Sequence, residues 1–114
     1  MKYTIEGFDQ QAALEARKDI KQEDGSIKTV KLDCVDLIIL RWIVDYFPDM
    51  RKTTIDGEIY GWIKYDKVLE EFPLLNIKKQ MLMIRLSKMV DLDILTHRTV
   101  KVKEGVFSYY GFGK

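Results

Sequence analysis

Residues 65–112 read YDKVLEEFPLLNIKKQMLMIRLSKMVDLDILTHRTVKVKEGVFSYYGF, and this stretch decides the expected fold. Apolar residues at helical spacing predict a short helix from about Tyr65 to Phe72. Pro73–Leu75 forms a tight connector, because proline cannot continue the helix. Asn76 is the expected N-cap of a longer helix, roughly Ile77–Val90. These residues therefore predict two helices joined by a turn.

A hairpin is expected directly after the second of these helices. Asp91–Asp93 is a turn, and two runs rich in β-branched and aromatic residues follow it, Ile94–Val102 and Val106–Phe112. Lys103-Glu104-Gly105 forms the tip between the two runs. A turn between helices that is followed at once by a hairpin is a fairly specific arrangement.

The strongest helix signal lies further towards the N-terminus and begins at Asp33, the expected N-cap. Asp36 at the third helical position places a second carboxylate near the positive end of the helix. Apolar residues then recur at helical spacing until Pro48, at positions Leu37, Leu40, Val44 and Phe47. A second apolar set falls elsewhere on the wheel, namely Ile39, Trp42, Ile43 and Tyr46. Such a helix is either central to its own fold or shared with a second chain, so Asp33–Phe47 is a candidate homodimer surface.

The remaining elements are shorter. Asp56-Gly57 predicts a tight turn between the strands Thr53–Ile55 and Glu58–Ile63. Near the N-terminus the expected elements are a strand at Lys2–Glu6, a helix at Gln10–Lys18 capped by Asp9, a polar loop at Gln22–Ser26 and a strand at Ile27–Leu32.

The order of elements from Asp33 onward is helix, strand, helix, turn, helix, strand, strand, which is the winged-helix order. We therefore expect an α+β protein with a winged helix-turn-helix and an N-terminal strand–helix–strand extension. Residues 33–112 form the winged-helix core of this single domain, and residues 1–32 form the extension. The last expected strand ends at Phe112, two residues before the end of the sequence. The chain is thus either the N-terminal part of a longer protein or a complete small protein.

Length and composition suit one globular domain. The chain has 114 residues, of which 46% are hydrophobic, and this suffices to bury a core without a metal or disulfide. Apolar runs are too short to span a membrane, and the opening MKYTIEGFDQ lacks the apolar core of a secretory signal. Cys34 is the only cysteine, so an intrachain disulfide is impossible. We expect a cytoplasmic protein without a membrane partner.

Charge is distributed unevenly along the chain although the total is only +1. Residues 1–30 hold five basic and six acidic groups, and residues 31–73 hold six basic and nine acidic groups. Residues 74–114 hold eight basic and three acidic groups, which gives this segment a net charge of +5. An acidic partner that docks on the C-terminal part is therefore expected, although an ordinary solvated surface has the same composition.

Several segments together resemble a known family. They are MKYTIEGF at the start, LDCVDLIILRWIVDYFP, YGWIKYDKVLEEFPLL, NIKKQMLMIRLSKMVDLDIL, HRTVKVK and VFSYYGFG. The chain resembles the N-terminal winged-helix domain of replication proteins, of the replication initiator or replisome organiser type, from phages, prophages and plasmids of Gram-positive bacteria. This resemblance implies DNA binding in origin recognition or recruitment of replication proteins. One departure is Asp93, where that family commonly has glycine, although aspartate tolerates the left-handed conformation of the turn.

The third helix of a winged helix-turn-helix usually enters the major groove, and its wing contacts phosphates. On the wheel of Ile77–Val90, Leu82, Leu86 and Met89 face the core. The candidate DNA-binding residues on the opposite side of this helix and at its start are Lys78, Lys79, Gln80, Met83 and Ser87. Lysine reaches a guanine edge or a phosphate, and glutamine pairs with adenine. The alternative is that these residues form an ordinary solvated helix face without a ligand.

Basic residues elsewhere complete the candidate interface. The wing supplies Arg98, Lys101 and Lys103, which suit phosphate contact, although edge strands also carry lysine to prevent aggregation. Lys64 and Lys67 stand at the start of the short helix, which crosses the duplex backbone in this fold.

Other residues are expected to be structural. Arg85 projects towards the apolar side of its helix, so we expect a salt bridge within the domain, to Asp45 or another acidic residue of the preceding helices. Cys34 is a small residue and is expected to be buried. Core positions are also expected for the aromatic residues Trp42, Tyr46, Phe47, Trp62 and Tyr65. One cysteine and one histidine, His97, cannot make a metal site. With no phosphate loop or catalytic triad in the sequence, we expect no cofactor, no catalytic residue and no enzyme activity.

The expected function is double-stranded DNA binding, in phage or plasmid DNA replication initiation or its control. Expected partners are duplex DNA, replication proteins and a second copy of the chain. Two alternatives remain: a winged helix used for protein–protein contact or dimerisation without DNA, and a transcriptional regulator. The two-sided apolar helix Asp33–Phe47 and the modest total charge favour the protein-only alternative.

Overall fold

The computed structural model describes residues 4–113 and has an α+β architecture with four α-helices and three small antiparallel sheets. In chain order the elements are β1 (Thr4–Ile5), β2 (Phe8–Asp9), α1 (Gln10–Glu15), β3 (Arg17–Lys21), β4 (Ile27–Lys31), α2 (Cys34–Tyr46), the 3-10 turn η1 (Phe47–Asp49), β5 (Lys52–Ile55), β6 (Glu58–Trp62), α3 (Tyr65–Glu71), the 3-10 turn η2 (Pro73–Leu75), α4 (Lys79–Asp91), β7 (Leu95–Val102) and β8 (Gly105–Phe112).

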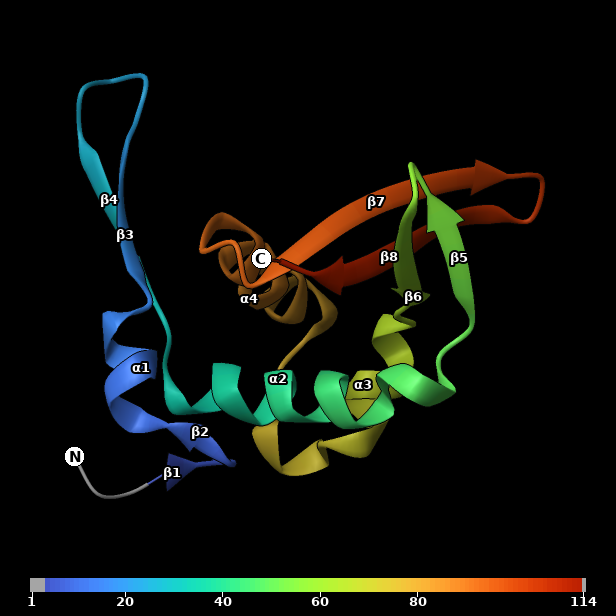
Figure 1. Ribbon diagram of the computed structural model, residues 1–114, viewed down its shortest axis with the longest axis horizontal. Helices are drawn as coiled ribbons and strands as arrows, with labels where there is room; N and C mark the ends of the chain where they lie inside the picture. The colour runs from blue at the N-terminus through green and yellow to red at the C-terminus, as the bar shows by residue number, and fades with distance from the viewer. Residues whose placement is uncertain (1–3, 114) are drawn as a thin grey trace.

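The largest sheet has four strands in the order β5-β6-β8-β7 (Figure 1). The expected hairpin turn at Asp56-Gly57 is confirmed: both residues have positive φ, 53° and 81°, as the favoured two-residue hairpin turn requires. β7 and β8 pair along their whole length from Leu95↔Phe112 to Val102↔Gly105. Their far end therefore projects beyond the two shorter strands of the sheet.

Helix α2 lies at the centre of the fold. Its N-terminus has the expected capping box, in which Asp33 accepts from the Asp36 amide and Asp36 accepts from the Asp33 amide, each at 2.9 Å. Both apolar sets of the helix contribute to the core, because Leu37 and Leu40 are buried together with Ile39 and Ile43. The core continues into α3, α4 and the sheet through Ile63, Val68, Leu82, Leu86, Met89, Leu95 and Tyr110.

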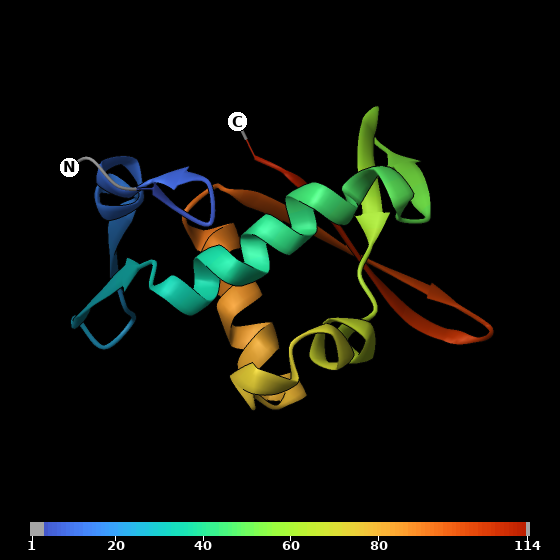
Figure 2. The same cartoon turned by 90° about the horizontal axis from the view of Figure 1, so that it is seen from below.

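Helix α4 packs by one face only. Leu82, Leu86 and Met89 are each 0% exposed, as their helical spacing predicts. Figures 1 and 2 both show α4 between the β3–β4 hairpin on one side and the β7–β8 hairpin on the other. Val30 of β4 is buried, and Ile94 just before β7 packs against the core. The helix is therefore held on two flanks and keeps an open face between them.

The N-terminal extension differs from the expected strand, helix and strand. The expected strand Lys2–Glu6 is confirmed only at Thr4–Ile5, and residues 2 and 3 lie outside the described part of the chain. Asp9 caps α1 as expected, but the helix ends at Glu15 and not at Lys18. Residues 17–21 form β3 instead, paired with β4. Tertiary pairing with β4 overrides the helix-forming composition here.

The expected N-cap at Asn76 is wrong. Asn76 has φ 49° and ends the 3-10 turn η2, where its N–H donates to the Pro73 carbonyl at 3.2 Å. Helix α4 begins two residues later than expected, with Lys78 in the N-cap position and no described side chain capping it. Asparagine favours both N-caps and left-handed turns, so its presence alone does not distinguish them.

Cys34 is exposed, which corrects the expectation that it is buried. It opens α2 and lines a surface pocket together with Leu37 of the same helix and with Leu14 of the N-terminal extension. The aromatic residues expected in the core are half-buried at its margin: Trp42, Tyr46, Phe47 and Tyr65 pack against it. Trp62 packs edge-on against Phe107, with ring centroids 5.2 Å apart.

Among the described residues, α1–α4 all lack the combination of length and apolar character that crossing a bilayer requires.

Candidate functional site

The open face of α4 carries the candidate residues that were expected on the helix Ile77–Val90 and at its start. All of them are exposed, namely Lys78, Lys79, Gln80, Met83 and Ser87. They face outward because Leu82, Leu86 and Met89 occupy the buried side of the same helix. The segment 76–90 contains no aspartate or glutamate, so no carboxylate of this helix interrupts the face before its last residue, Asp91.

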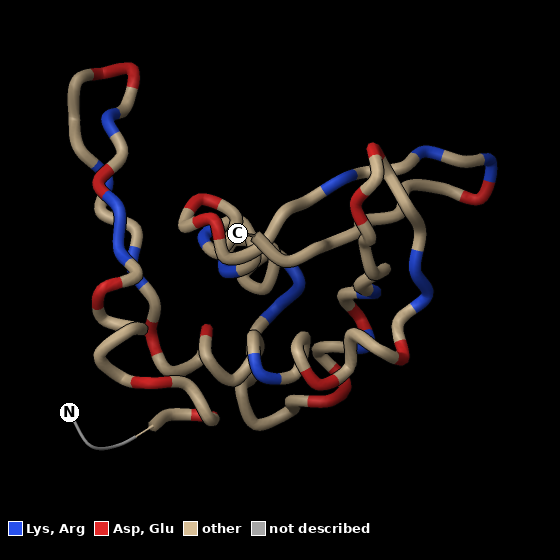
Figure 3. The backbone as a smooth tube through the Cα atoms, in the orientation of Figure 1, with Lys and Arg blue, Asp and Glu red and all other residues tan. Residues whose placement is uncertain are grey.

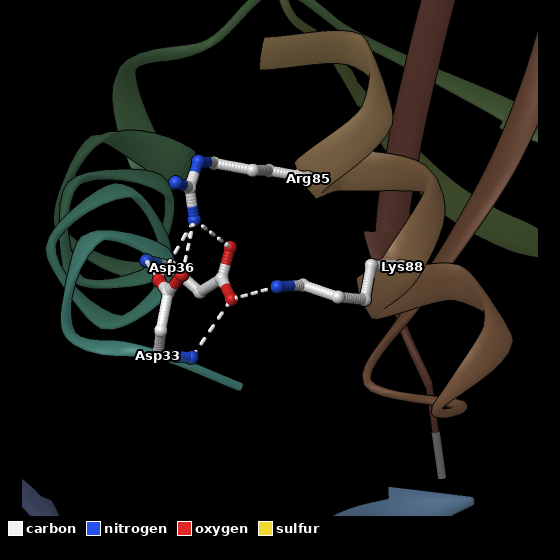
Figure 4. A network of polar contacts seen from close by, with 4 residues as sticks. All are labelled: Asp33, Asp36, Arg85 and Lys88. Atoms are coloured by element: carbon white, nitrogen blue, oxygen red, sulfur yellow. Dashed lines mark hydrogen bonds and ion pairs between the residues drawn. The ribbon is translucent and has the colours of Figure 1, made fainter. Parts of the chain in front are cut away.

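The rotation of α4 is set by an ionic network with the start of α2, drawn in Figure 4. Arg85 donates from Nη1 to both carboxylate oxygens of Asp33, at 2.7 and 2.8 Å, and to Oδ1 of Asp36 at 3.0 Å. Lys88 pairs with Oδ2 of Asp36, which is fully buried. The expected intradomain salt bridge of Arg85 is confirmed, with Asp33 and Asp36 as its partners. Asp45 pairs with Arg41 instead.

This network changes the acidity of Asp33. Partial burial opposes its ionisation, but the hydrogen bonds from Arg85 and the Asp36 amide outweigh that effect and lower the pKa of Asp33 to about 2. Asp33 is therefore charged throughout the ordinary pH range and keeps Arg85 and α4 attached to α2. Lys88, which sequence reasoning did not single out, belongs to this network and not to the open face.

The starts of α3 and α4 lie together. The Lys79 ammonium lies 5.8 Å from the ring centroid of Tyr65, the first residue of α3. Lys67 lies 5.1 Å from the ring centroid of Tyr46 and is half-buried, whereas Lys64 is exposed. Lys79 therefore lies at the start of α3, next to the chain position of Lys64, whereas Lys67 lies against Tyr46 at the end of α2.

The candidates of the β7–β8 hairpin form a separate group. Lys101 and Lys103 are exposed near its tip, far from α4 in both cartoon views. Figure 3 shows basic segments on this hairpin and on α4, with tan backbone between them. Arg98 is partly engaged, since Nη2 lies 3.7 Å from Asp56 and Nε donates to the Tyr60 hydroxyl at 3.4 Å. The lysines of the β7–β8 hairpin and the lysines of α4 are thus not brought into contact.

His97 is held by the protein itself. Its ring stacks on Tyr110 with centroids 4.4 Å apart, and burial lowers its pKa. Tyr110 in turn shares a hydrogen bond with the Tyr65 hydroxyl at 2.8 Å, and burial together with this bond raises the pKa of Tyr110. The His97 ring thus covers its cross-strand neighbour on β8, the buried Tyr110. Over residues 4–113, His, Cys, Asp and Glu nowhere cluster in the threes that a metal ion needs.

Apolar side chains share the open face of α4 with the polar candidates. Met81, Met83 and Ile84 are about half exposed, and Leu74 in η2 is 99% exposed. Met83 is one of the candidates expected from the sequence, whereas Met81, Ile84 and Leu74 are not. This face is consequently mixed and not purely basic.

Sequence reasoning also missed the β3–β4 hairpin as a neighbour of α4. Lys28, Thr29 and Val30 of β4 line a cleft together with Ile84, Ser87 and Lys88 of α4. The sequence of Ile27–Leu32 predicts this strand, but it does not indicate which helix packs against it.

No protein-family model, no curated protein and no solved structure matches this chain.

Proposed function

We propose that the protein binds duplex DNA as a winged helix-turn-helix, with α4 in the major groove and the β7–β8 hairpin as the wing. The element order α2, β5–β6, α3, α4 and β7–β8 supports this proposal, as does the pairing of β6 with β8, which joins the wing to the helices. Helix α4 has 13 residues, and an α-helix with its side chains is about 10–12 Å across, which fits a major groove about 12 Å wide.

The open face of α4 is the observation that carries the proposal. It is exposed, it lacks carboxylates from residue 76 to residue 90, and it begins at a helix N-terminus that no described side chain caps. Lys78 and Lys79 flank that N-terminus, whose free N–H groups and dipole favour a phosphate. Gln80 on the next position offers a pair of hydrogen bonds to adenine.

The biological setting we propose is the initiation of phage or plasmid DNA replication, or its control. This part rests on the resemblance of the sequence to replication proteins. A transcriptional regulator with the same DNA-binding face is the alternative setting, and the geometry of α4 serves both.

The direct test is a fluorescence-anisotropy titration with random duplexes at two salt concentrations. Because each phosphate contact contributes about −0.9 to the log–log salt slope, a few contacts predict a slope of roughly −3 to −6. Replacing Lys78 and Lys79 with Ala should weaken binding and flatten the slope by about two. Replacing Lys101 and Lys103 with Ala should do the same, equally for every DNA sequence.

A double Lys21→Ala, Lys31→Ala variant is the matched control, because both lysines are exposed and lie outside the proposed face. Its affinity should equal that of the wild type. Wild-type protein that does not bind duplex at low salt, or that binds without salt dependence, contradicts the proposal.

A second candidate is a protein–protein contact through the same end of the molecule. The exposed Leu74, with Met81 and Ile84 nearby in the chain, favours it, because such a side chain in water contributes no stability to the monomer. Sedimentation of the wild type and of Leu74→Lys distinguishes the two functions. A wild-type oligomer that dissociates in the variant, together with absent DNA binding, supports the second candidate.

A further inference from the structure

The β3–β4 hairpin presents two different faces. Residues that pair directly across an antiparallel ladder point to the same side, and successive residues alternate. One face therefore carries the pairs Lys18↔Val30 and Ile20↔Lys28, and the other carries Arg17↔Lys31, Asp19↔Thr29 and Lys21↔Ile27. Val30 is buried, so the first face is the one turned towards α4.

Contacts with the end of α4 hold this hairpin in place. The Lys18 ammonium lies 3.6 Å from Asp93 and donates to the Asp91 carbonyl at 3.4 Å. Buried Val30 adds an apolar contact on the same face. The hairpin consequently stands beside α4 on the flank opposite the β7–β8 hairpin, as Figures 1 and 2 show.

The cleft between β4 and α4 carries positive charge and no negative charge in its lining. Of its six lining residues, two are lysines, Lys28 and Lys88, and none is acidic. Lys88 is paired with Asp36, whereas Lys28 is exposed and has no ion-pair partner within residues 4–113. Ser87, which belongs to the open face of α4, also lines the cleft and adds a hydroxyl donor.

We propose that this cleft binds the phosphate backbone of the duplex, with the Lys28 ammonium as its principal contact and the Ser87 hydroxyl beside it. The proposal rests on the proposed function, because the backbone in question belongs to the duplex that lies on α4. Ser87 joins the cleft to the open face of that helix. The duplex is then held on both flanks of α4, by β4 on one side and by the β7–β8 hairpin on the other.

The experiment compares Lys28→Gln with Lys21→Gln in the full chain. Both changes remove one lysine charge from the same hairpin, but Lys21 lies on the face turned away from α4. A contact worth −0.9 in the salt slope contributes a factor of roughly eight at 0.1 M salt. Lys28→Gln should therefore lower duplex affinity roughly eight-fold for every sequence and flatten the slope by about one, while Lys21→Gln leaves both unchanged.

A second measurement does not depend on the variants. Acetylation of lysines with and without random duplex, read by mass spectrometry, should show Lys28 protected by DNA and Lys21 unprotected. Equal effects of the two variants, or no effect of either, overturn the cleft proposal while the proposed function stands if the α4 lysines still matter. Absence of any wild-type binding overturns both, and that outcome is recognisable before any variant is made.

Discussion

Helices α2 and α4 have the same length of 13 residues but contribute differently to the protein. Five residues of α2 are buried, and none of the exposed large apolar side chains in the described chain belongs to it. Three residues of α4 are buried, whereas Met81, Met83 and Ile84 of that helix are exposed. Helix α2 therefore keeps its large apolar side chains buried or half-buried, whereas α4 exposes three of its own to solvent.

This difference bears on the expected dimer. Ile39 and Ile43 belong to the core, so they are not available as an interface between two copies. A helix with apolar residues on several sides is either central to its own fold or shared with a second chain. The burial of Ile39 and Ile43 indicates the first of these for α2. The apolar residues of α2 that are only half-buried, and so remain accessible to a second copy, are Val35, Ile38, Trp42, Val44 and Tyr46.

The largest expected effect tests this contrast with one charge placed on each helix. Ile39→Asp buries a carboxylate without a partner, since Ile39 is 0% exposed, and should lower the free energy of unfolding by about 4 kcal/mol or more. Met83→Asp on α4 should leave it almost unchanged, because Met83 is 45% exposed. Urea denaturation followed by circular dichroism measures both. A folded, stable Ile39→Asp protein would contradict the central position of α2.

The second prediction concerns the polar contact between the two helices. Asp36→Ala leaves Arg85 and Lys88 without their buried partner and should lower the free energy of unfolding by about 3 kcal/mol. Asp45→Ala is the control, because it removes an exposed carboxylate from an i,i+4 pair on α2 and should have a much smaller effect. Equal decreases in the free energy of unfolding of the two variants would mean that the buried network stabilises the fold no more than the exposed pair does.

The third prediction concerns the open face of α4. Gln80→Ala should reduce discrimination in favour of a preferred duplex by about 1–3 kcal/mol and affect random DNA little, because only base contacts carry sequence information. The fold should be unchanged, since Gln80 is exposed. Competition titrations with a selected and a random duplex measure the difference, and Lys103→Ala should weaken both duplexes equally. The assignment is wrong if Lys103→Ala changes preference and Gln80→Ala does not.

The smallest effect is the pH dependence of the junction at Asp33. Its folded-state pKa of about 2 lies below the ordinary 3.8, so its contribution is complete above about pH 4 and is lost as pH falls through about 2. A shift of this size corresponds to about 2.5 kcal/mol, which solvent screening at a half-exposed carboxylate reduces to about 1 kcal/mol. Urea denaturation at pH 5 and pH 2.5 measures it. In Asp33→Asn, which keeps the cap, this part of the acid sensitivity should be absent.

Much of the fold could be predicted because its signals are local. The capping box at Asp33, the turn at Asp56-Gly57 and the core positions of α4 each depend on residues a few positions apart. β3 could not be predicted, because it becomes a strand only by pairing with β4. The N-terminus of α4 was misplaced because Asn76 suits a left-handed turn as well as a cap.

The candidate site was predictable to a similar extent. Exposure of Lys79, Gln80 and Ser87 follows from the helical spacing of the core residues on α4. The partners of Arg85 could not be predicted, because α2 carries Asp33 at its N-cap and Asp45 near its end, and only the packing of the two helices chooses between them. The cleft beside Lys28 depends on contacts across more than fifty residues of chain.

The Asp36–Arg85 contact also has a consequence for the time course of folding. Its two residues are 49 positions apart in the chain, so the contact requires closure of a long loop and is expected to form late, after the local hairpins and helices. An interaction that is absent from the transition state slows unfolding without speeding folding. The network at the start of α2 would then slow the step in which α4 detaches from α2, and so lengthen the lifetime of the folded state.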